Sequence, residues 1–470
     1  MIYGRLKGLN ERQLAIIVHS LFSGWMLSFL FEGQILYTLS ELYGIIPNVM
    51  IFGGIAASFS GLLLSGFFVK SKKRAKRLFL YCYPVFILLS IPFFFEPSIL
   101  WTLGIVIGSF LAGNCVASWG YYLKSSTPKS ERIKTIADMI ILSNVLMIII
   151  NMATIHISSY LGLALSIIML LLAFIFALKL PEDSYIIESE SNVKDYVSIK
   201  SLLVFLCFFI IVITINSGLM YEVVNPAFEH LKWLTSWYWA VPYIIAILIM
   251  RNLPKRISRS HLLYVAIAMI GISFISFMSL GRSAISYIII NTLMLGACGV
   301  YDLFWWSILG EMLDFRDNAA KILGTGLSAN NFGILLGGMI GNAIISDNIY
   351  STNPTLLALT VACVGLALLP FLHKHLSFLL KDHVYLKMYS EMTMEEENNE
   401  INHGERLKIL SEREKQVTSR LLQGKTYKTI AEELFISENT VKYFVKNIYS
   451  KYSISSRSEL IETIFSDKEI

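Results

Sequence analysis

The stretch LFISENTVKYFVKNIYSKYSISSRSEL, residues 434–460, contains a predicted helix whose two faces differ. Ser437 is a favoured N-cap residue, so the helix is predicted to run over 438–452. Four side chains at helical spacing form its apolar face, namely Val441, Val445, Ile448 and Tyr452. Amide, hydroxyl and basic side chains lie mostly on the other side, namely Asn439, Thr440, Lys442, Tyr443, Lys446, Asn447 and Ser450. The apolar face predicts packing against other helices, which leaves the polar face for a partner.

The residues around this helix predict a small four-helix domain over 406–470. Two capping boxes, Ser411 with Glu414 and Ser456 with Glu459, mark helix starts. The four predicted helices run over 411–423, 427–435, 438–452 and 456–466. Apolar residues of the first two helices would pack against the apolar face of the third, namely Val417, Leu421, Ile430 and Leu434.

The polar face of the predicted 438–452 helix suits contact with DNA. Lysine, asparagine and tyrosine side chains can donate hydrogen bonds to base edges and phosphates. An apolar back and a basic, amide-bearing front are typical of a helix that lies in the major groove. Residues 406–470 hold 12 Lys and Arg against 9 Asp and Glu, a net charge of only +3. One copy should therefore bind weakly, because affinity rises with the number of phosphates neutralised. A purely structural helix is the alternative.

A wider pattern in the same region resembles the LuxR-type DNA-binding domain. It comprises L-S-E-R-E at 410–414, Gly424, I-A at 430–431, L-F-I-S-E-N-T-V-K at 434–442, N-I-Y at 447–449 and S-R-S-E-L at 456–460. The resemblance implies that the recognition helix contacts DNA through Lys442, Tyr443 and Lys446, and that the last helix pairs two copies. Two positions depart from the family pattern, namely Phe444, where a histidine is frequent, and Tyr452-Ser453, where Leu-Gly is usual.

The rest of the chain has the composition of a membrane protein. The whole sequence is 55% hydrophobic and 16% charged, whereas soluble globular chains are about 25% charged. Apolar runs close to the length of a bilayer span cover 14–38, 45–69, 78–95, 98–120, 135–156, 158–180, 200–223, 232–250, 262–281, 284–309, 322–345 and 355–372. We therefore expect an all-α protein, in which a polytopic bundle of about twelve transmembrane helices in two six-helix halves precedes the small four-helix domain.

The distribution of basic residues predicts the orientation of these spans. If the N-terminus is cytoplasmic, the cytoplasmic segments hold 22 Lys and Arg, while the outer loops hold only Lys232 and Arg282. We expect a multi-pass protein of a bacterial plasma membrane with both termini in the cytoplasm, where DNA lies. The predicted domains are a transmembrane domain at 1–373, an interfacial helix with an acidic linker at 374–405, and a DNA-binding domain at 406–470.

The two halves share a feature that resembles the major facilitator superfamily. KSKKRAKR at 70–77 follows the second span, and RNLPKRISRS at 251–260 follows the eighth, which is the second span of the second half. The resemblance implies a central cavity lined by the first, fourth, seventh and tenth helices. The family's loop signature places an acidic residue near the position of Lys70. This departure counts against an ordinary transport cycle, because the acid normally helps to lock one face shut.

Polar residues within the predicted spans are candidate ligand contacts, because such groups are costly inside a bilayer. The candidates are Glu32, Gln34, Asn114, Asn216, Asp302, Trp305 and Asn330. Acidic residues beside aromatic rings favour a cationic or amphipathic small molecule. The alternative is that these side chains pair with one another and hold the helices together.

These features predict a membrane-bound one-component transcriptional regulator. A small molecule would enter the bundle, shift its conformation and change how the cytoplasmic domain binds promoter DNA. The alternatives are a transporter with an appended regulatory or localising domain, and a transporter whose C-terminal domain binds only protein. The expected partners are double-stranded DNA, the lipid bilayer, the small molecule, a second copy through the last helix, and RNA polymerase. The sequence shows no metal cluster, nucleophile–base arrangement or phosphate loop, so we expect no enzyme, metal or cofactor.

Overall fold

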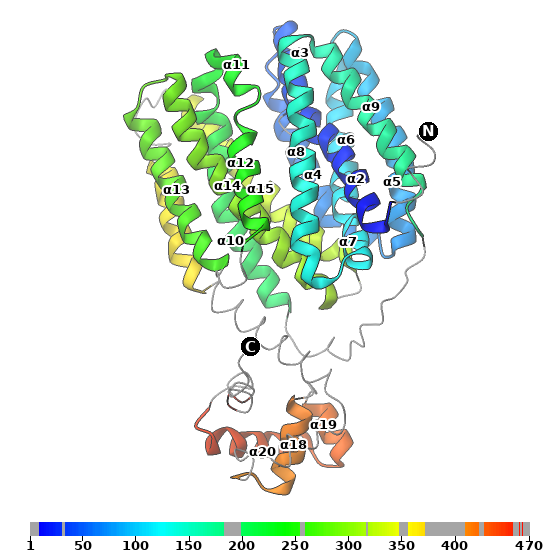
Figure 1. Ribbon diagram of the computed structural model, residues 1–470, viewed down its shortest axis with the longest axis vertical. Coiled ribbons are helices and arrows are strands. Elements are labelled where there is room, and N and C mark those ends of the chain that lie inside the picture. Colours follow the sequence, from blue (N-terminus) through cyan, green and yellow to red (C-terminus); the bar gives the residue numbers. More distant parts are fainter. Residues whose placement is uncertain are drawn as a thin grey trace. The chain divides into compact units, whose positions relative to one another are not determined.

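The computed structural model of the protein divides into two compact units (Figure 1). One unit comprises Met1–Ile187 with Leu203–Leu369, and the other comprises Glu188–Leu202 with Pro370–Ile470. The structure describes residues 9–30, 33–182, 199–253, 259–315, 318–346, 356–371, 409–422, 427–454, 460 and 463. These residues form helices and connecting turns, with no strand among them. The predicted domain boundaries at 373 and 405 lie outside the described residues.

The helices of the membrane unit lie alongside one another (Figure 1). Those of the first half are α2 (Glu11–Trp25), α3 (Gln34–Leu42), α4 (Asn48–Phe68), α5 (Lys72–Ser90), α6 (Ile99–Ser118), α7 (Gly120–Ser126), α8 (Arg132–His156) and α9 (Ser159–Leu178). Those of the second half are α10 (Ile199–Leu219), α11 (Lys232–Thr235), α12 (Ala240–Arg251), α13 (Arg259–Ser279), α14 (Ala284–Met312) and α15 (Ala319–Ser346), followed by the helix Leu356–Phe371.

Each of the twelve apolar runs in the sequence coincides with helix in the described residues. Within those residues nine helices are long and apolar enough to cross a membrane, or ten if Pro226–Thr235 and Ala240–Arg251, bent by 75°, form one span. The two other runs are α15, which is 28 residues long and polar in its middle, and the shorter helix Leu356–Phe371. The expected fold class, an all-α polytopic bundle followed by a small helical domain, is confirmed.

The first span is an interrupted helix. α2 ends at Trp25, Met26–Leu30 form a π-helical turn, and α3 begins after Gly33. A side chain at position 33 would overlap the backbone of Ser28, so this close approach requires glycine. Apolar length alone could not predict the interruption, because the composition on either side of it is equally apolar.

Small and polar residues bring the two halves of the membrane unit into close contact. α4 packs against α6 within the first half and against α15 of the second half. A Cβ atom at Gly324 of α15 would overlap the carbonyl of Leu62, so glycine permits the helices to approach. Asn331 Nδ2 donates a hydrogen bond to Ser58 Oγ at 2.9 Å across the same interface. Such contacts are typical of helices packed in a membrane.

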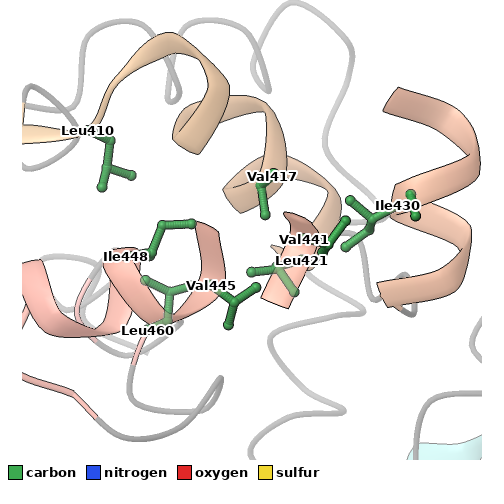
Figure 2. Close-up of a cluster of buried hydrophobic side chains, with 9 residues drawn as sticks. Leu410, Val417, Leu421, Ile430, Val441, Val445, Ile448 and Leu460 are labelled. Carbon is green, nitrogen blue, oxygen red and sulfur yellow. The ribbon is translucent and has the colours of Figure 1, made fainter. Parts of the chain in front are cut away.

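The C-terminal unit contains α18 (Glu412–Leu422), α19 (Tyr427–Leu434) and α20 (Glu438–Lys451). Their bounds agree within a residue with the first three helices predicted from the sequence. One core of buried side chains lies between them (Figure 2), namely Leu410, Val417, Leu421, Ile430, Ala431, Val441, Val445, Ile448 and Leu460. The fourth predicted helix, 456–466, lies outside the described residues except for Leu460, which joins this core, and Thr463.

Candidate nucleic-acid interface and intramembrane polar sites

Helix α20 begins where the sequence predicts. The Ser437 hydroxyl accepts a hydrogen bond from Thr440 N at 3.1 Å and lies 2.7 Å from Thr440 Oγ1. This cap satisfies an amide that the first turn of the helix would otherwise leave unpaired. The Thr440 hydroxyl, a predicted DNA contact, is therefore engaged in the helix cap.

The two faces of α20 are those that its sequence predicts. Val441, Val445 and Ile448 are buried in the core of the C-terminal unit (Figure 2). The predicted DNA contacts that are exposed are Asn439, Lys442, Tyr443, Lys446 and Ser450, whereas Thr440 and Asn447 are half-buried. Lys442 Nζ lies 3.0 Å from Glu438 Oε1, with both side chains about half exposed. Such a pair contributes only about 0.3–0.5 kcal/mol, so Lys442 stays available to a phosphate or a base.

The capping box at the start of α18 has a third partner. Ser411 N donates to Glu414 Oε2 at 2.7 Å, and Glu414 N donates to Ser411 Oγ at 3.4 Å. Lys451 Nζ, from the last turn of α20, donates to the same carboxylate oxygen at 2.6 Å and to Ile409 O at 3.2 Å. Burial raises the pKa of Glu414, but the hydrogen bonds from Lys451 and Ser411 outweigh it and hold the pKa below its ordinary value. The role of Lys451 does not follow from the sequence, because no helical period relates residues 37 positions apart.

Asp302 on α14 is paired with a residue that the sequence analysis did not single out. The Tyr243 hydroxyl on α12 donates a hydrogen bond to Asp302 Oδ2 at 2.6 Å. Trp305, one turn along α14, is buried and stacks on Tyr301 with ring centroids 6.1 Å apart. Its indole Nε1 has no hydrogen-bond partner among the described residues. Asp302 and Trp305 are three residues apart on α14, which is less than one helical turn.

Four buried asparagines of the described membrane unit have an Oδ1 without a hydrogen-bond partner there, and two of them, Asn114 and Asn216, are predicted ligand contacts. Asn114 Nδ2 on α6 donates to Phe110 O at 3.0 Å, but Asn114 Oδ1 has no partner among the described residues. Asn216 on α10 is also buried, and its Oδ1 likewise has no partner there. Buried polar atoms are normally hydrogen-bonded, so these oxygens are available to a donor group of a ligand.

The remaining predicted ligand contacts make no hydrogen bond to Asp302 within the described residues. Gln34 is the half-buried first residue of α3. Asn330 is half-buried on α15, and its backbone carbonyl accepts a hydrogen bond from Thr214 at 3.3 Å. Within the described residues, no hydrogen bond or ion pair joins either residue, or the two buried asparagines, to Asp302. Glu32 lies outside the described residues. Across the described ranges, no three His, Cys, Asp or Glu side chains are grouped to hold a metal ion.

Two ion pairs that the sequence analysis missed join α8 of the first half to the second half. Arg132 donates to both carboxylate oxygens of Asp314, at 2.7 and 2.9 Å, and to Gly310 O at 2.9 Å. Arg251 at the end of α12 donates to both oxygens of Asp138, at 2.6 and 3.1 Å. Arg132 and Asp138 are about 9 Å apart along α8. The signal that could have found Asp138 was an acidic residue inside a predicted span.

The charged contacts between the halves differ at the two ends of the bundle. Asn318, close to Asp314, donates Nδ2 to Gly66 O at 2.7 Å, beside the loop at 70–77. The ion pair between Lys232 and Glu41, in segments predicted to face outward, is 2.9 Å long but more than half exposed. An exposed pair contributes about 0–1 kcal/mol. Among the ion pairs between the halves in the described residues, the less exposed ones therefore lie at the predicted cytoplasmic end.

Comparison with known proteins identifies the C-terminal domain. Residues 408–464 match the family model of bacterial regulatory proteins, luxR family. The chain is 43% identical over 53 residues to the spore germination protein GerE of Bacillus subtilis (strain 168), which is 11% of this chain and 72% of that protein. The chain belongs to the luxR family. The luxR-type region is also 44% identical over 61 residues to the transcriptional regulatory protein LnrK of the same strain, which is 13% of this chain and 28% of that protein.

The membrane unit of this luxR-family chain has the fold of solved transporters. The human organic anion transporter MFSD10 (TETRAN) matches with a TM-score of 0.57 at 12% identity, over 77% of this chain and 98% of that chain. The proton:xylose symporter XylE, of the major facilitator superfamily, matches with a TM-score of 0.59 at 12% identity, over 77% of this chain and 94% of that chain. At this identity the likeness shows the fold alone. The expected resemblance to the major facilitator superfamily is confirmed at the level of the fold.

The two departures from the luxR-family pattern have structural consequences. Phe444 packs partly against the core of the C-terminal unit, with its ring 6.0 Å from that of Tyr443. Ser453 has a φ of 54°, a left-handed conformation that glycine adopts without steric cost. A side chain in this conformation costs about 1–2 kcal/mol. The luxR-type domain is therefore locally strained at the position where the family usually has glycine.

Proposed function

We propose that this chain is a membrane-bound one-component transcriptional regulator, whose transmembrane domain senses a small molecule and whose luxR-type domain binds promoter DNA. The observation that carries the proposal is the exposed face of α20, which presents Lys442, Tyr443 and Lys446 to solvent while the opposite face is buried. The same chain contains at least nine helices suited to cross a membrane. With both parts in one chain, binding in the membrane can alter DNA binding without a second protein.

The ligand would be a cationic or amphipathic small molecule that binds beside Asp302. The hydrogen bond from Tyr243 orients the carboxylate between α12 and α14. Tyr301 and Trp305 supply aromatic faces, which attract cations and apolar groups. The unpaired oxygens in α6 and α10 would accept donors from the same molecule. Glu32, Gln34 and Asn330 complete the proposed contacts.

The ion pairs that α8 makes with the second half would be the contacts that form in one conformation of the membrane domain and break in the other. A ligand shifts a conformational equilibrium only if it binds the two states with different affinity. Helix α14 carries Asp302, and the end of the same helix supplies the Gly310 carbonyl that Arg132 binds. A ligand that displaces α14 would therefore strain the contacts of Arg132. Their release would change how the luxR-type domain is presented to DNA.

The first test asks whether the luxR-type domain binds DNA in the full-length protein. Cross-linking in cells, followed by sequencing of the recovered DNA, should show defined sites for the parent chain. The K442A/K446A variant should lose those sites while it accumulates in the membrane to the same level. Unchanged occupancy in this variant would remove the main support for the regulator, and a protein partner in place of DNA would then be favoured.

The second test asks whether the membrane domain senses a compound. Compounds are screened for a transcriptional response at the sites recovered above. Asp302→Asn and Glu32→Gln should leave protein level and DNA occupancy near those of the parent but weaken the response. A full dose response in both variants would show that these carboxylates do not contact the ligand. Failure of both variants to accumulate would favour the alternative that these groups hold helices together.

A transporter with an appended regulatory or localising domain is the second candidate. The fold shared with MFSD10 and XylE, over 77% of this chain in each case, supports it. Uptake into vesicles that contain the purified chain separates the two candidates. A regulator binds the compound without accumulating it, whereas a transporter accumulates it inside the vesicle at many molecules for each protein.

The wider organisation of the chain belongs to the same proposal. We propose domains at 1–373 and 406–470, joined by residues 374–405, with both termini in the cytoplasm of a bacterium. The last helix, 456–466, would pair two copies on DNA, and RNA polymerase would be the partner at the promoter. The low charge of the C-terminal domain supports pairing, because two copies neutralise twice as many phosphates as one.

A further inference from the structure

Helix α5 has one face that no other helix of the described residues covers. Arg74, Arg77, Tyr81 and Leu88 share this face at helical spacing, and we call these four residues the outer face of α5. All four are exposed, with Tyr81 at 73% and Leu88 at 64%. The buried residues of α5, such as Phe79 and Phe86, lie on the other side. α5 lies at the edge of the membrane unit and packs against α9 and α6 (Figure 1).

The basic residues at the start of α5 divide into a paired set and an unpaired set. Lys72 Nζ contacts Glu11 Oε1 at 2.5 Å, and Lys76 Nζ lies 3.5 Å from Glu182 Oε1. Arg74 and Arg77 have no carboxylate partner anywhere in the described ranges. Among the described residues, carboxylates therefore pair with Lys72 and Lys76, while the two guanidinium groups on the outer face have no such counter-charge.

The length of the outer face of α5 along the helix axis matches the thickness of one lipid leaflet. Arg77 and Tyr81 are one turn apart, about 6 Å along the axis. Arg77 and Leu88 are about 16 Å apart, which is close to the thickness of about 15 Å for half of the hydrocarbon core. Basic residues therefore lie at headgroup depth when Leu88 lies near the midplane. Tyrosine is favoured at the level between them, where an amphipathic ring meets both environments.

We propose that the outer face of α5 binds an anionic phospholipid, with its phosphate between Arg74 and Arg77, its glycerol region beside Tyr81 and an acyl chain along Leu88. Guanidinium groups bind phosphate oxygens through two parallel hydrogen bonds, which a lysine cannot reproduce. The phosphate supplies the counter-charge that no carboxylate of the described residues gives Arg74 and Arg77. By the basic-residue distribution, this lipid lies in the cytoplasmic leaflet.

The phosphates of DNA would also attract two arginines, but the rest of the surface favours lipid. Tyr81 and Leu88 continue the same face away from the arginines, and both are more than 60% exposed. A nucleic acid at the membrane surface would leave them uncovered, whereas a lipid molecule contacts all four residues at once. The outer face of α5 therefore has the order of groups of a phospholipid, from charged to apolar.

The test is lipid retention by the purified full-length chain. The protein in detergent is mixed with equal amounts of phosphatidylglycerol and phosphatidylcholine, and bound lipids are counted by native mass spectrometry. The parent should retain phosphatidylglycerol in preference. Each basic residue contributes about fivefold at an anionic lipid surface, so the R74Q/R77Q variant should lose roughly 30-fold of this preference. The preference of the R74K/R77K variant should lie between those of the parent and R74Q/R77Q, because lysine keeps the charge but cannot form the two parallel hydrogen bonds of a guanidinium group.

Lys179→Gln is the matched control. Lys179 is exposed at the end of α9, which neighbours α5, and it has no ion pair in the described part of the chain. This variant should bind phosphatidylglycerol as the parent does. Equal retention by the parent and R74Q/R77Q would overturn the proposal, and so would an equal loss in Lys179→Gln. If R74Q/R77Q fails to accumulate, Arg74→Gln alone should still lose about fivefold.

Two further arms separate the sources of phosphate. Glycerol 3-phosphate at millimolar concentration should not displace the lipid, because it has no acyl chain to cover Leu88; displacement would overturn a lipid site. Binding of a 30-base-pair duplex in phosphatidylcholine nanodiscs should be the same for R74Q/R77Q and the parent. Weaker DNA binding with unchanged lipid retention would assign this surface to nucleic acid. None of these measurements requires the sensed compound or a promoter, so the outcome is independent of the proposed regulator.

Discussion

Lys451 Nζ lies 2.6 Å from Glu414 Oε2, so one contact fixes the last turn of α20 to the first turn of α18. The Glu414 side chain is 5% exposed and that of Lys451 is 36% exposed. A carboxylate this deeply placed depends on its partner, because removal of one member leaves a buried charge unpaired. The contact also limits rotation of α20 about its own axis, which helps to set the direction of Lys442 and Lys446.

Glu414→Gln should destabilise the C-terminal domain by about 1–3 kcal/mol at pH 7. Because the folded-state pKa of Glu414 lies below its ordinary value, its stabilisation is present above about pH 4.3 and is lost as the pH falls through the folded-state pKa. The measurement is urea unfolding of the 400–470 fragment between pH 3 and 7. Glu412→Gln removes an exposed carboxylate, so it should change the free energy of unfolding by less than about 0.5 kcal/mol. An equal loss of stability in acid for Glu414→Gln and the parent would contradict this assignment.

Lys442→Ala and Lys446→Ala should weaken DNA binding and leave the fragment folded, because neither removes buried apolar area. A lysine that contacts a phosphate should lower the salt slope by about one unit for every DNA sequence. A lysine that reads a base should cost roughly 1–3 kcal/mol at one position of the site. Val445→Asp is the contrasting variant, since an unpaired charge in the core shown in Figure 2 should unfold the domain. Circular dichroism and binding at several salt concentrations provide the measurement.

Ser453→Gly should stabilise the C-terminal domain. Glycine removes the cost of the left-handed conformation, about 1–2 kcal/mol. It also makes the unfolded chain more flexible, which lowers the stability by about 0.5–1 kcal/mol. The expected gain in the free energy of unfolding is about 0.5–1 kcal/mol, measured by urea unfolding. Ser453→Ala keeps the strain and should bring no such gain. Equal stability of the two variants would show that this position is not strained.

Exchange of the charges in the pair between Asp138 and Arg251 tests the contact between the halves. Asp138→Arg alone and Arg251→Asp alone each place like charges opposite one another at the site of the ion pair and should alter transcription without ligand. The double variant restores an opposite pair and should return output toward the parent. Glu41→Gln breaks the exposed pair with Lys232 and should have little effect. Additive effects of the two single variants, with no rescue in the double, would show that this pair does not control the output.

Reporter fusions at Glu391 and after Ile470 should both behave as cytoplasmic. The reason is that the segments predicted to be cytoplasmic hold 22 Lys and Arg residues, whereas the outer loops hold only two. At each position, one fusion carries a reporter that is active only outside the cytoplasm, and a second carries a reporter that is active only inside it. The activities of the two reporters are compared. Activity of the outer reporter at either position would overturn the predicted orientation and, with it, access of α20 to DNA.

Local sequence patterns were sufficient for the elements and their faces. The period that places Val441, Val445 and Ile448 on one side depends only on the geometry of a helix, and Ser437 marks its start. The membrane helices followed from apolar length in the same way. The interruption after Trp25 did not follow, since a π-helical turn depends on which backbone packs against Gly33.

The sequence by itself determined an α-helical membrane protein with a LuxR-type DNA-binding domain, because helical period, apolar length and short motifs are properties of neighbouring residues. Only the tertiary structure decided which side chains meet. Tyr243 reaches Asp302 across 59 positions, Lys451 reaches Glu414 across 37, and Arg132 reaches Asp314 across 182. Each contact depends on how one helix is rotated and placed against another. Packing of whole faces sets those rotations, and a periodic pattern gives the face of a residue but not its partner.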